Sequence, residues 1–86
     1  MGRIEKLYQK VKNAPASTKF TDLIKLAESV GLVKKKSKGG GHIYIYKLPE
    51  TKLLLNFQRI SGGQAKKYQV YQLLDAIDEY SLLRED

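Results

Sequence analysis

The spacing of hydrophobic residues first predicts two helices. Ile4, Leu7, Tyr8 and Val11 follow the i, i+3, i+4, i+7 pattern of an amphipathic helix over about residues 3–13. A second set repeats the helical spacing at Phe20, Leu23, Ile24, Ala27 and Val30. We expect Thr21 to cap the start of this helix and Gly31 to end it in a left-handed conformation.

From Leu32 onward the period changes from 3.6 to 2, which predicts strands. Short strands are expected over residues 32–36, 42–46 and 52–58, joined by turns at 38–41 and 48–51. In the second strand, Ile43 and Ile45 are expected to face the helices. His42, Tyr44 and Tyr46 would then lie on the opposite, free face.

After the third strand, the glycine-rich segment 59–65 is predicted to be a mobile loop. Val70, Leu73, Leu74 and Ile77 then predict a last helix from about Tyr68 to Tyr80. The order α-α-β-β-β-α indicates an α+β fold, with a three-stranded antiparallel sheet covered by helices on one face. We expect one domain over residues 1–86, with a core at 20–82 and an extra N-terminal helix at 3–13.

The composition favours a soluble globular protein, since 42% of the 86 residues are hydrophobic and 29% are charged. No apolar run approaches the roughly 18–20 residues of a membrane helix, and the charged N-terminus has no apolar h-region. The chain has no cysteine, which excludes disulfides and thiolate metal sites and fits a cytoplasmic location.

The net charge of +7 is concentrated in the middle of the chain. Residues 31–67 contain nine basic residues and one acid, whereas the rest of the chain carries a net charge of −1. A solvated surface usually mixes its charges, so this segregation favours a polyanionic partner. A lysine-rich soluble surface is the alternative.

The single histidine, His42, follows Gly39-Gly40-Gly41 and is the candidate catalytic residue. An imidazole can act as general acid or base near neutral pH, and the 2′-OH of RNA is a built-in nucleophile, so no metal or cofactor is required. One histidine without cysteine argues against a zinc site, and neither glycine run opens a P-loop. The carboxylates of Asp75, Asp78 and Glu79 are interpreted as a solvated helix face.

Lysines near His42 would attract phosphates, and tyrosine rings would stack on unpaired bases. Strand propensity alone is an alternative explanation for the tyrosines. The candidate RNA-binding residues are Lys34, Lys35, Lys36, Lys38, Gly39, Gly40, Gly41, Tyr44, Tyr46, Lys66 and Lys67.

The chain resembles the HicA toxins, which are small mRNA interferases of bacterial toxin–antitoxin pairs. The resemblance covers about Phe20 to Leu82. It is carried by Phe20-Thr21-Asp22-Leu23-Ile24, the basic strand Lys34-Lys35-Lys36, the turn Gly39-Gly40-Gly41-His42-Ile43-Tyr44-Ile45, and Lys66-Lys67-Tyr68-Gln69-Val70-Tyr71-Gln72-Leu73-Leu74.

This resemblance implies a fold similar to the double-stranded-RNA-binding domain and metal-independent endoribonuclease activity. His42 takes the catalytic role and Gly39 the motif glycine. The resemblance also implies RNA as substrate, a monomer when free, and a hetero-oligomer with a HicB-like antitoxin that covers the site, with no membrane partner.

The chain departs from the family at two places. Gly40 replaces the usual serine, and Asn56-Phe57-Gln58 stands where many members have a proline and a further histidine. Two alternatives therefore stay open: a non-catalytic RNA-binding module of the same fold, and a protein-interaction domain that uses the sheet edge or the acidic last helix.

Overall fold

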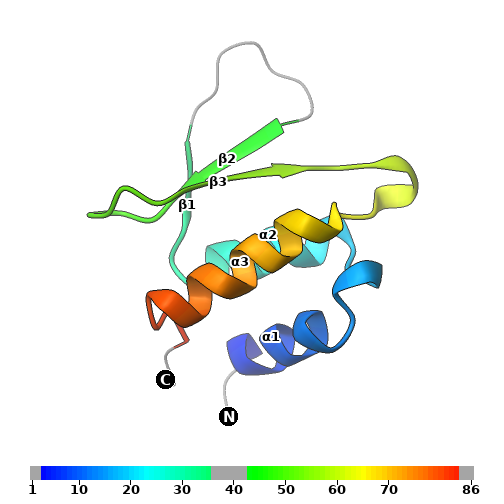
Figure 1. The fold of residues 1–86 in the computed structure, drawn as a ribbon, viewed down its shortest axis with the longest axis horizontal. Helices are drawn as coiled ribbons and strands as arrows, with labels where there is room; N and C mark the ends of the chain where they lie inside the picture. The colour runs from blue at the N-terminus through cyan, green and yellow to red at the C-terminus, as the bar shows by residue number, and fades with distance from the viewer. Residues whose placement is uncertain (1–2, 36–42, 84–86) are drawn as a thin grey trace.

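The chain forms three α-helices and one three-stranded sheet (Figure 1) in a computed structural model that describes residues 3–35 and 43–83. The helices are α1 (Arg3–Asn13), α2 (Phe20–Ser29) and α3 (Lys67–Glu79), and the strands are β1 (Val33–Lys35), β2 (Ile43–Lys47) and β3 (Leu54–Gln58). Short 3-10 turns, η1 (Pro15–Ser17) and η2 (Ser61–Gly63), precede α2 and α3. The predicted order of elements is confirmed.

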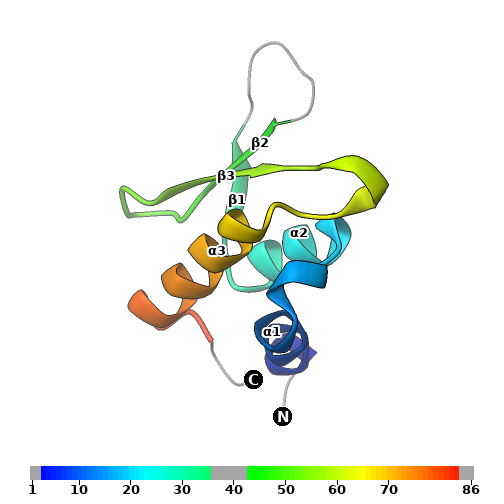
Figure 2. The same ribbon diagram turned by 45° about the vertical axis from the view of Figure 1, so that its right-hand side comes forward.

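The sheet is an antiparallel meander with the strand order β1-β2-β3, which confirms the predicted α+β class. Lys34 lies opposite Tyr46, and Tyr46 lies opposite Leu55. Figures 1 and 2 show α2 and α3 directly beneath the sheet and α1 on the far side of these two helices. The helices therefore cover one face of the sheet.

The two ends of α2 are set by its backbone rather than by a capping side chain. The N-cap is Lys19, whose carbonyl accepts the Leu23 N–H at 3.0 Å, so the prediction of Thr21 as N-cap is wrong. Gly31 ends the helix with φ +106°, as predicted. The Leu32 N–H donates a hydrogen bond to the Ala27 carbonyl at 3.0 Å, and the Gly31 N–H donates one to the Glu28 carbonyl at 3.2 Å. These two bonds form a Schellman motif.

The same motif ends α3, but with Ser81 in the left-handed position at φ 51°. The Leu82 N–H donates to the Ile77 carbonyl at 2.9 Å and the Ser81 N–H to that of Asp78 at 3.3 Å. Glycine adopts this conformation without the steric cost that a Cβ imposes.

We expect Ser81→Gly to raise the free energy of unfolding by about 0.5–1 kcal/mol, measured by urea denaturation. Ser29→Gly is the matched control because Ser29 lies in the last turn of α2, where glycine destabilises. Equal effects of the two substitutions would contradict this explanation.

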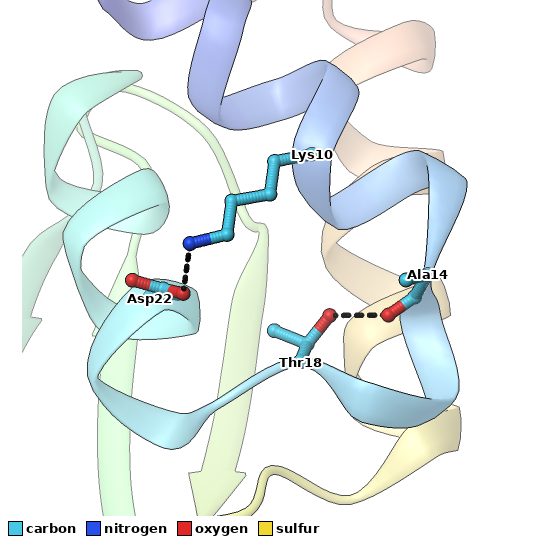
Figure 3. Close-up of polar contacts among 4 residues, drawn as sticks. All are labelled: Lys10, Ala14, Thr18 and Asp22. Atoms are coloured by element: carbon cyan, nitrogen blue, oxygen red, sulfur yellow. Dashed lines mark hydrogen bonds and ion pairs between the residues drawn. The ribbon is translucent and has the colours of Figure 1, made fainter.

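The N-terminal helix belongs to the main core. Tyr8 and Val11 of α1 are buried, and the Tyr8 hydroxyl donates a hydrogen bond to Asp78 Oδ1 on α3 at 3.0 Å. Figure 3 shows two further polar contacts around the connection to α2: Lys10 Nζ lies 3.2 Å from Asp22 Oδ2, and the Thr18 hydroxyl donates to the Ala14 carbonyl at 3.0 Å.

The segment 59–65 is tied to the connection that precedes α2. Gln64 forms an isolated bridge with Lys19, and the buried Ala65 donates its N–H to the Thr18 carbonyl at 3.0 Å. Arg59 pairs with Ala65 across the loop, and Gly62 at the turn has φ 79°. These contacts place the end of β3 beside the start of both α2 and α3.

The predicted orientation of the second strand is wrong. Tyr46 is only 1% exposed and Tyr44 packs against the same core, so both tyrosines face the helices. Ile45, between them in the strand, faces the other side because successive side chains alternate. The physical reason is size: the space between sheet and helices is filled by large aromatic rings, including Phe20 and Phe57.

Candidate nucleic-acid interface

Tyr46 connects the sheet to α2 from within the core. Its hydroxyl donates a hydrogen bond of 2.7 Å to Glu28 Oε2, and its ring centroid lies 5.6 Å from that of Phe57. A ring buried in this way offers no face to a nucleobase. Tyr46 therefore belongs to the core and not to an RNA-binding surface.

The surroundings of Tyr46 also raise the pKa of its phenol. The largest cause is burial, and the hydrogen bond to the Glu28 carboxylate and its negative charge add to it. Because the folded-state pKa lies above the ordinary value of 10.0, the contribution of this group to stability is complete below that pH and is lost as the pH rises above it.

We expect the free energy of unfolding to fall more steeply in wild type than in Tyr46→Phe as the pH rises above about 10. Denaturant titrations at several pH values would measure both slopes. Tyr8→Phe gives an independent comparison, because burial and the bond to Asp78 raise the pKa of the Tyr8 phenol as well. Parallel curves for wild type and both variants would contradict the expectation.

Tyr44 sits at the margin of the core, where a lysine meets it. Its ring centroid lies 5.2 Å from that of Phe20 at an interplanar angle of 56°, and Lys34 Nζ lies 4.5 Å from the Tyr44 centroid. Lys34 is directly opposite Tyr46 in the ladder, so its side chain leaves the sheet on the helix side. The structure thus brings together two of the predicted residues, Lys34 and Tyr44, in a cation–π pair.

A cleft of about 390 Å³ opens beside this pair, between α2 and β2. It is lined by Phe20, Thr21, Ile24, Lys25, Glu28, Tyr44 and Arg59. The aromatic and aliphatic walls suit a flat apolar group such as a nucleobase, and the cations of Lys25 and Arg59 suit a phosphate.

Sequence reasoning had missed Lys25 and Arg59 as site residues. Lys25 follows Thr21 by one helical turn, so a helical-wheel comparison with Phe20 and Ile24 would have placed it near the same groove. Arg59 directly follows β3 and lines the cleft together with residues of α2 and β2. No pattern within one segment of the sequence predicts that these distant segments meet.

The open face of the sheet is aliphatic and basic rather than aromatic. It carries the side chains that alternate with Lys34, Tyr44, Tyr46, Leu55 and Phe57, namely those of Val33, Lys35, Ile45, Lys47, Leu54 and Asn56. Lys35 therefore remains available to a phosphate on this face, and both it and Lys47 are exposed.

Lys66 and Lys67 lie in the helical layer, at the start of α3, and not on the sheet with Lys34 and Lys35. Each lies beside an exposed tyrosine on the same helix: Lys66 Nζ is 5.9 Å from the Tyr68 centroid and Lys67 Nζ is 5.9 Å from that of Tyr71. These two rings are 56% and 44% exposed, so they can stack on a base as Tyr46 cannot.

In the sequence, Tyr68 and Tyr71 lie outside the apolar stripe that Val70, Leu73 and Leu74 form on this helix. This pattern could have predicted that the two rings are exposed. Arg59, which lines the cleft, forms an isolated β-bridge with Ala65. Ala65 directly precedes Lys66, so this bridge connects the cleft to the basic start of α3.

The remaining predicted site residues lie outside the described residues: Lys36, Lys38, Gly39, Gly40, Gly41 and His42. The part of the chain that is described resumes at Ile43, the first residue of β2. The next residue, Tyr44, lines the cleft.

Within residues 3–35 and 43–83, no group of histidine, cysteine or carboxylate side chains is arranged to hold a metal ion. No helix in this part of the chain is long and apolar enough to cross a membrane.

No protein-family model matches the sequence, and no curated protein or solved structure is significantly similar to it.

Proposed function

We propose that the chain is an RNA-binding endoribonuclease of the HicA type, a toxin controlled by a HicB-like antitoxin. The observation that carries the proposal is the cleft beside Lys34 and Tyr44, where aromatic walls meet the cations of Lys25 and Arg59. This cleft contains Tyr44, two residues after His42 in the sequence, and the surrounding segment holds the excess positive charge of the chain.

In the proposed reaction, the His42 imidazole accepts the proton of a ribose 2′-OH. The 2′ oxygen attacks the adjacent phosphorus, the bond to the 5′ oxygen breaks, and that oxygen leaves with a proton from an acid, giving a 2′,3′-cyclic phosphate and a 5′-OH. Lysine and arginine cations stabilise the negative charge that develops on the phosphate oxygens. A base of the RNA occupies the aromatic cleft.

The activity is tested by incubating the purified chain with a long single-stranded RNA in the presence of EDTA. The proposal expects fragments with 5′-OH ends, because an internal nucleophile leaves the phosphate on the 3′ side. Fragments with 5′-phosphate ends, or activity that disappears in EDTA, would contradict it.

Binding to RNA is expected to depend on phosphate contacts. If Lys25, Lys34, Lys35 and Arg59 each contact one phosphate, log K plotted against log salt has a slope of about −3 for a single strand. Lys35→Ala should reduce that slope by about 0.7, measured by fluorescence anisotropy over a salt series. Lys6→Ala on α1 is the matched control and should leave the slope unchanged. A slope near zero in wild type would contradict phosphate binding.

A non-catalytic RNA-binding module is the second candidate. The exposed rings of Tyr68 and Tyr71 beside Lys66 and Lys67 favour it, because stacking and phosphate attraction need no reactive group. Tight, salt-dependent binding without any cleavage would select this candidate over the enzyme.

A further inference from the structure

The outer edge of β3 has unpaired backbone groups. The strand is last in the sheet order, and the Leu48 N–H donates to the Leu53 carbonyl at 3.2 Å, so this carbonyl points toward the β2 side. The Leu53 N–H donates to the Thr51 hydroxyl instead. In an antiparallel ladder, bonded and non-bonded pairs alternate. The N–H and C=O groups of Leu54 and Asn56 therefore point away from β2, and they find no hydrogen-bond partner among the described residues.

The edge is closed at one end. The same alternation turns the Gln58 N–H outward, and there it donates to Gln69 Oε1 at 2.7 Å. Gln69 is only 4% exposed, so this side chain is held in place by the core. A strand added to β3 can consequently pair with Leu54 and Asn56 but not with the Gln58 N–H, which fixes where it must stop.

A groove of about 320 Å³ runs beside the open part of this edge, between β3 and α3. Leu54 and Asn56 form part of its strand side, and Asp75 and Glu79 form part of its helix side. Asp75 and Glu79 are one helical turn apart and exposed, and neither forms an ion pair within the part of the chain that is described. The groove is therefore acidic on a chain whose net charge is +7.

We propose that the β3 edge and its acidic groove bind an extended segment of a partner protein in which lysine or arginine alternates with apolar residues. Its backbone would pair with Leu54 and Asn56 as a fourth strand, and its basic side chains would meet Asp75 and Glu79. RNA is disfavoured here because its phosphates would face these carboxylates. The inference does not depend on the proposed ribonuclease activity, since no residue that lines this groove also lines the cleft between α2 and β2.

The β1 edge of a second copy of the chain fits the β3 edge less well. The other free edge, β1, has three residues, and Val33 and Lys35 use their backbone groups to pair with β2. Within β1 only Lys34 turns its backbone outward, and its side chain already lies over the Tyr44 ring. A foreign segment with several free ladder positions makes more hydrogen bonds.

The probe is the peptide Ac-KVKVKVK-NH2, with Ac-EVEVEVE-NH2 as its charge-reversed control, titrated into the isotope-labelled protein and followed by NMR. The lysine peptide should shift the amide signals of Leu54 and Asn56 and slow their hydrogen exchange, because these N–H groups become bonded. The glutamate peptide should bind at least about fivefold more weakly.

Two pairs of variants separate backbone pairing from charge. Leu54→Pro removes an N–H that has no hydrogen-bond partner among the described residues and should weaken peptide binding at least about tenfold. Leu54→Ala keeps the N–H and should change binding less than about twofold. Asp75→Lys combined with Glu79→Lys should weaken binding about fivefold. Glu5→Lys combined with Glu50→Lys makes the same change in net charge elsewhere and should have little effect.

The proposal is overturned if Leu54 and Asn56 keep their shifts and exchange rates, or if both peptides bind equally. It is also overturned if the signals of β1 respond instead of those of β3. If the signals of both sheet edges broaden with increasing protein concentration in the absence of peptide, the occupant of the β3 edge is a second copy of the chain and not a foreign segment.

Discussion

Replacement of Tyr46 by alanine is expected to lower the free energy of unfolding by about 3–5 kcal/mol. The ring is 1% exposed and packs against Phe57, so its removal leaves a cavity between the sheet and α2 that the backbone of β2 cannot fill. The substitution also leaves the Glu28 carboxylate without its 2.7 Å hydrogen bond. A cost of this size is a large fraction of the stability of a small domain.

Urea denaturation followed by circular dichroism would measure the effect. Tyr46→Phe is the matched control, since it keeps the ring and removes only the hydroxyl, and we expect a cost of about 1 kcal/mol. A cost below about 1 kcal/mol for Tyr46→Ala would mean that the ring lies on the solvent side of the sheet, as the sequence had suggested.

Replacement of His42 by alanine is expected to reduce the rate of RNA cleavage by about 10²–10⁴-fold, the usual contribution of general acid–base catalysis. The affinity for RNA should change little, because the proposed role of His42 is proton transfer, whereas the phosphate contacts are assigned to lysine and arginine side chains. Single-turnover cleavage and anisotropy binding would be measured on the same RNA, so that chemistry and binding are separated.

Gly40→Ser supplies the comparison in the opposite direction, because it introduces the serine that is usual in the HicA proteins that the sequence resembles. We expect faster cleavage if the serine hydroxyl contacts the phosphate, and growth arrest on expression that requires His42. Equal cleavage by wild type and His42→Ala would refute the catalytic role of the histidine while leaving the RNA-binding surface intact.

The elements were predictable because their patterns are local. The helical spacing around Val11, Leu23 and Leu73 and the period of two around Tyr44 and Phe57 each lie within one segment, and the structure has an element at each place. The orientation of β2 was predicted wrongly, because isoleucine and tyrosine both suit a strand and both alternating sets contain large hydrophobic residues.

The third strand contained the missing information. Its residues Asn56 and Gln58 are polar, whereas Leu55 and Phe57 are apolar, so its core-facing side can be read from the sequence. Once the turn after β2 fixes the register, Tyr46 opposite Leu55 must share that side. A correct choice for β2 therefore required the pairing between strands as well as the pattern within one strand.

The candidate site was predictable only where it is continuous in the chain. Lys34 and Lys35 followed from the charge run, but the cleft depends on Lys25 and Arg59, which approach from α2 and from the loop after β3. The exposure of Tyr68 and Tyr71 likewise depends on which side of α3 packs against the core.

The hydrogen bond from Tyr8 to Asp78 joins residues 70 positions apart and seats the first helix against the last. During synthesis, Tyr8 leaves the ribosome long before Asp78 exists, so α1 has no completed surface to dock on until α3 has emerged. The core therefore closes only after α3 has left the ribosome.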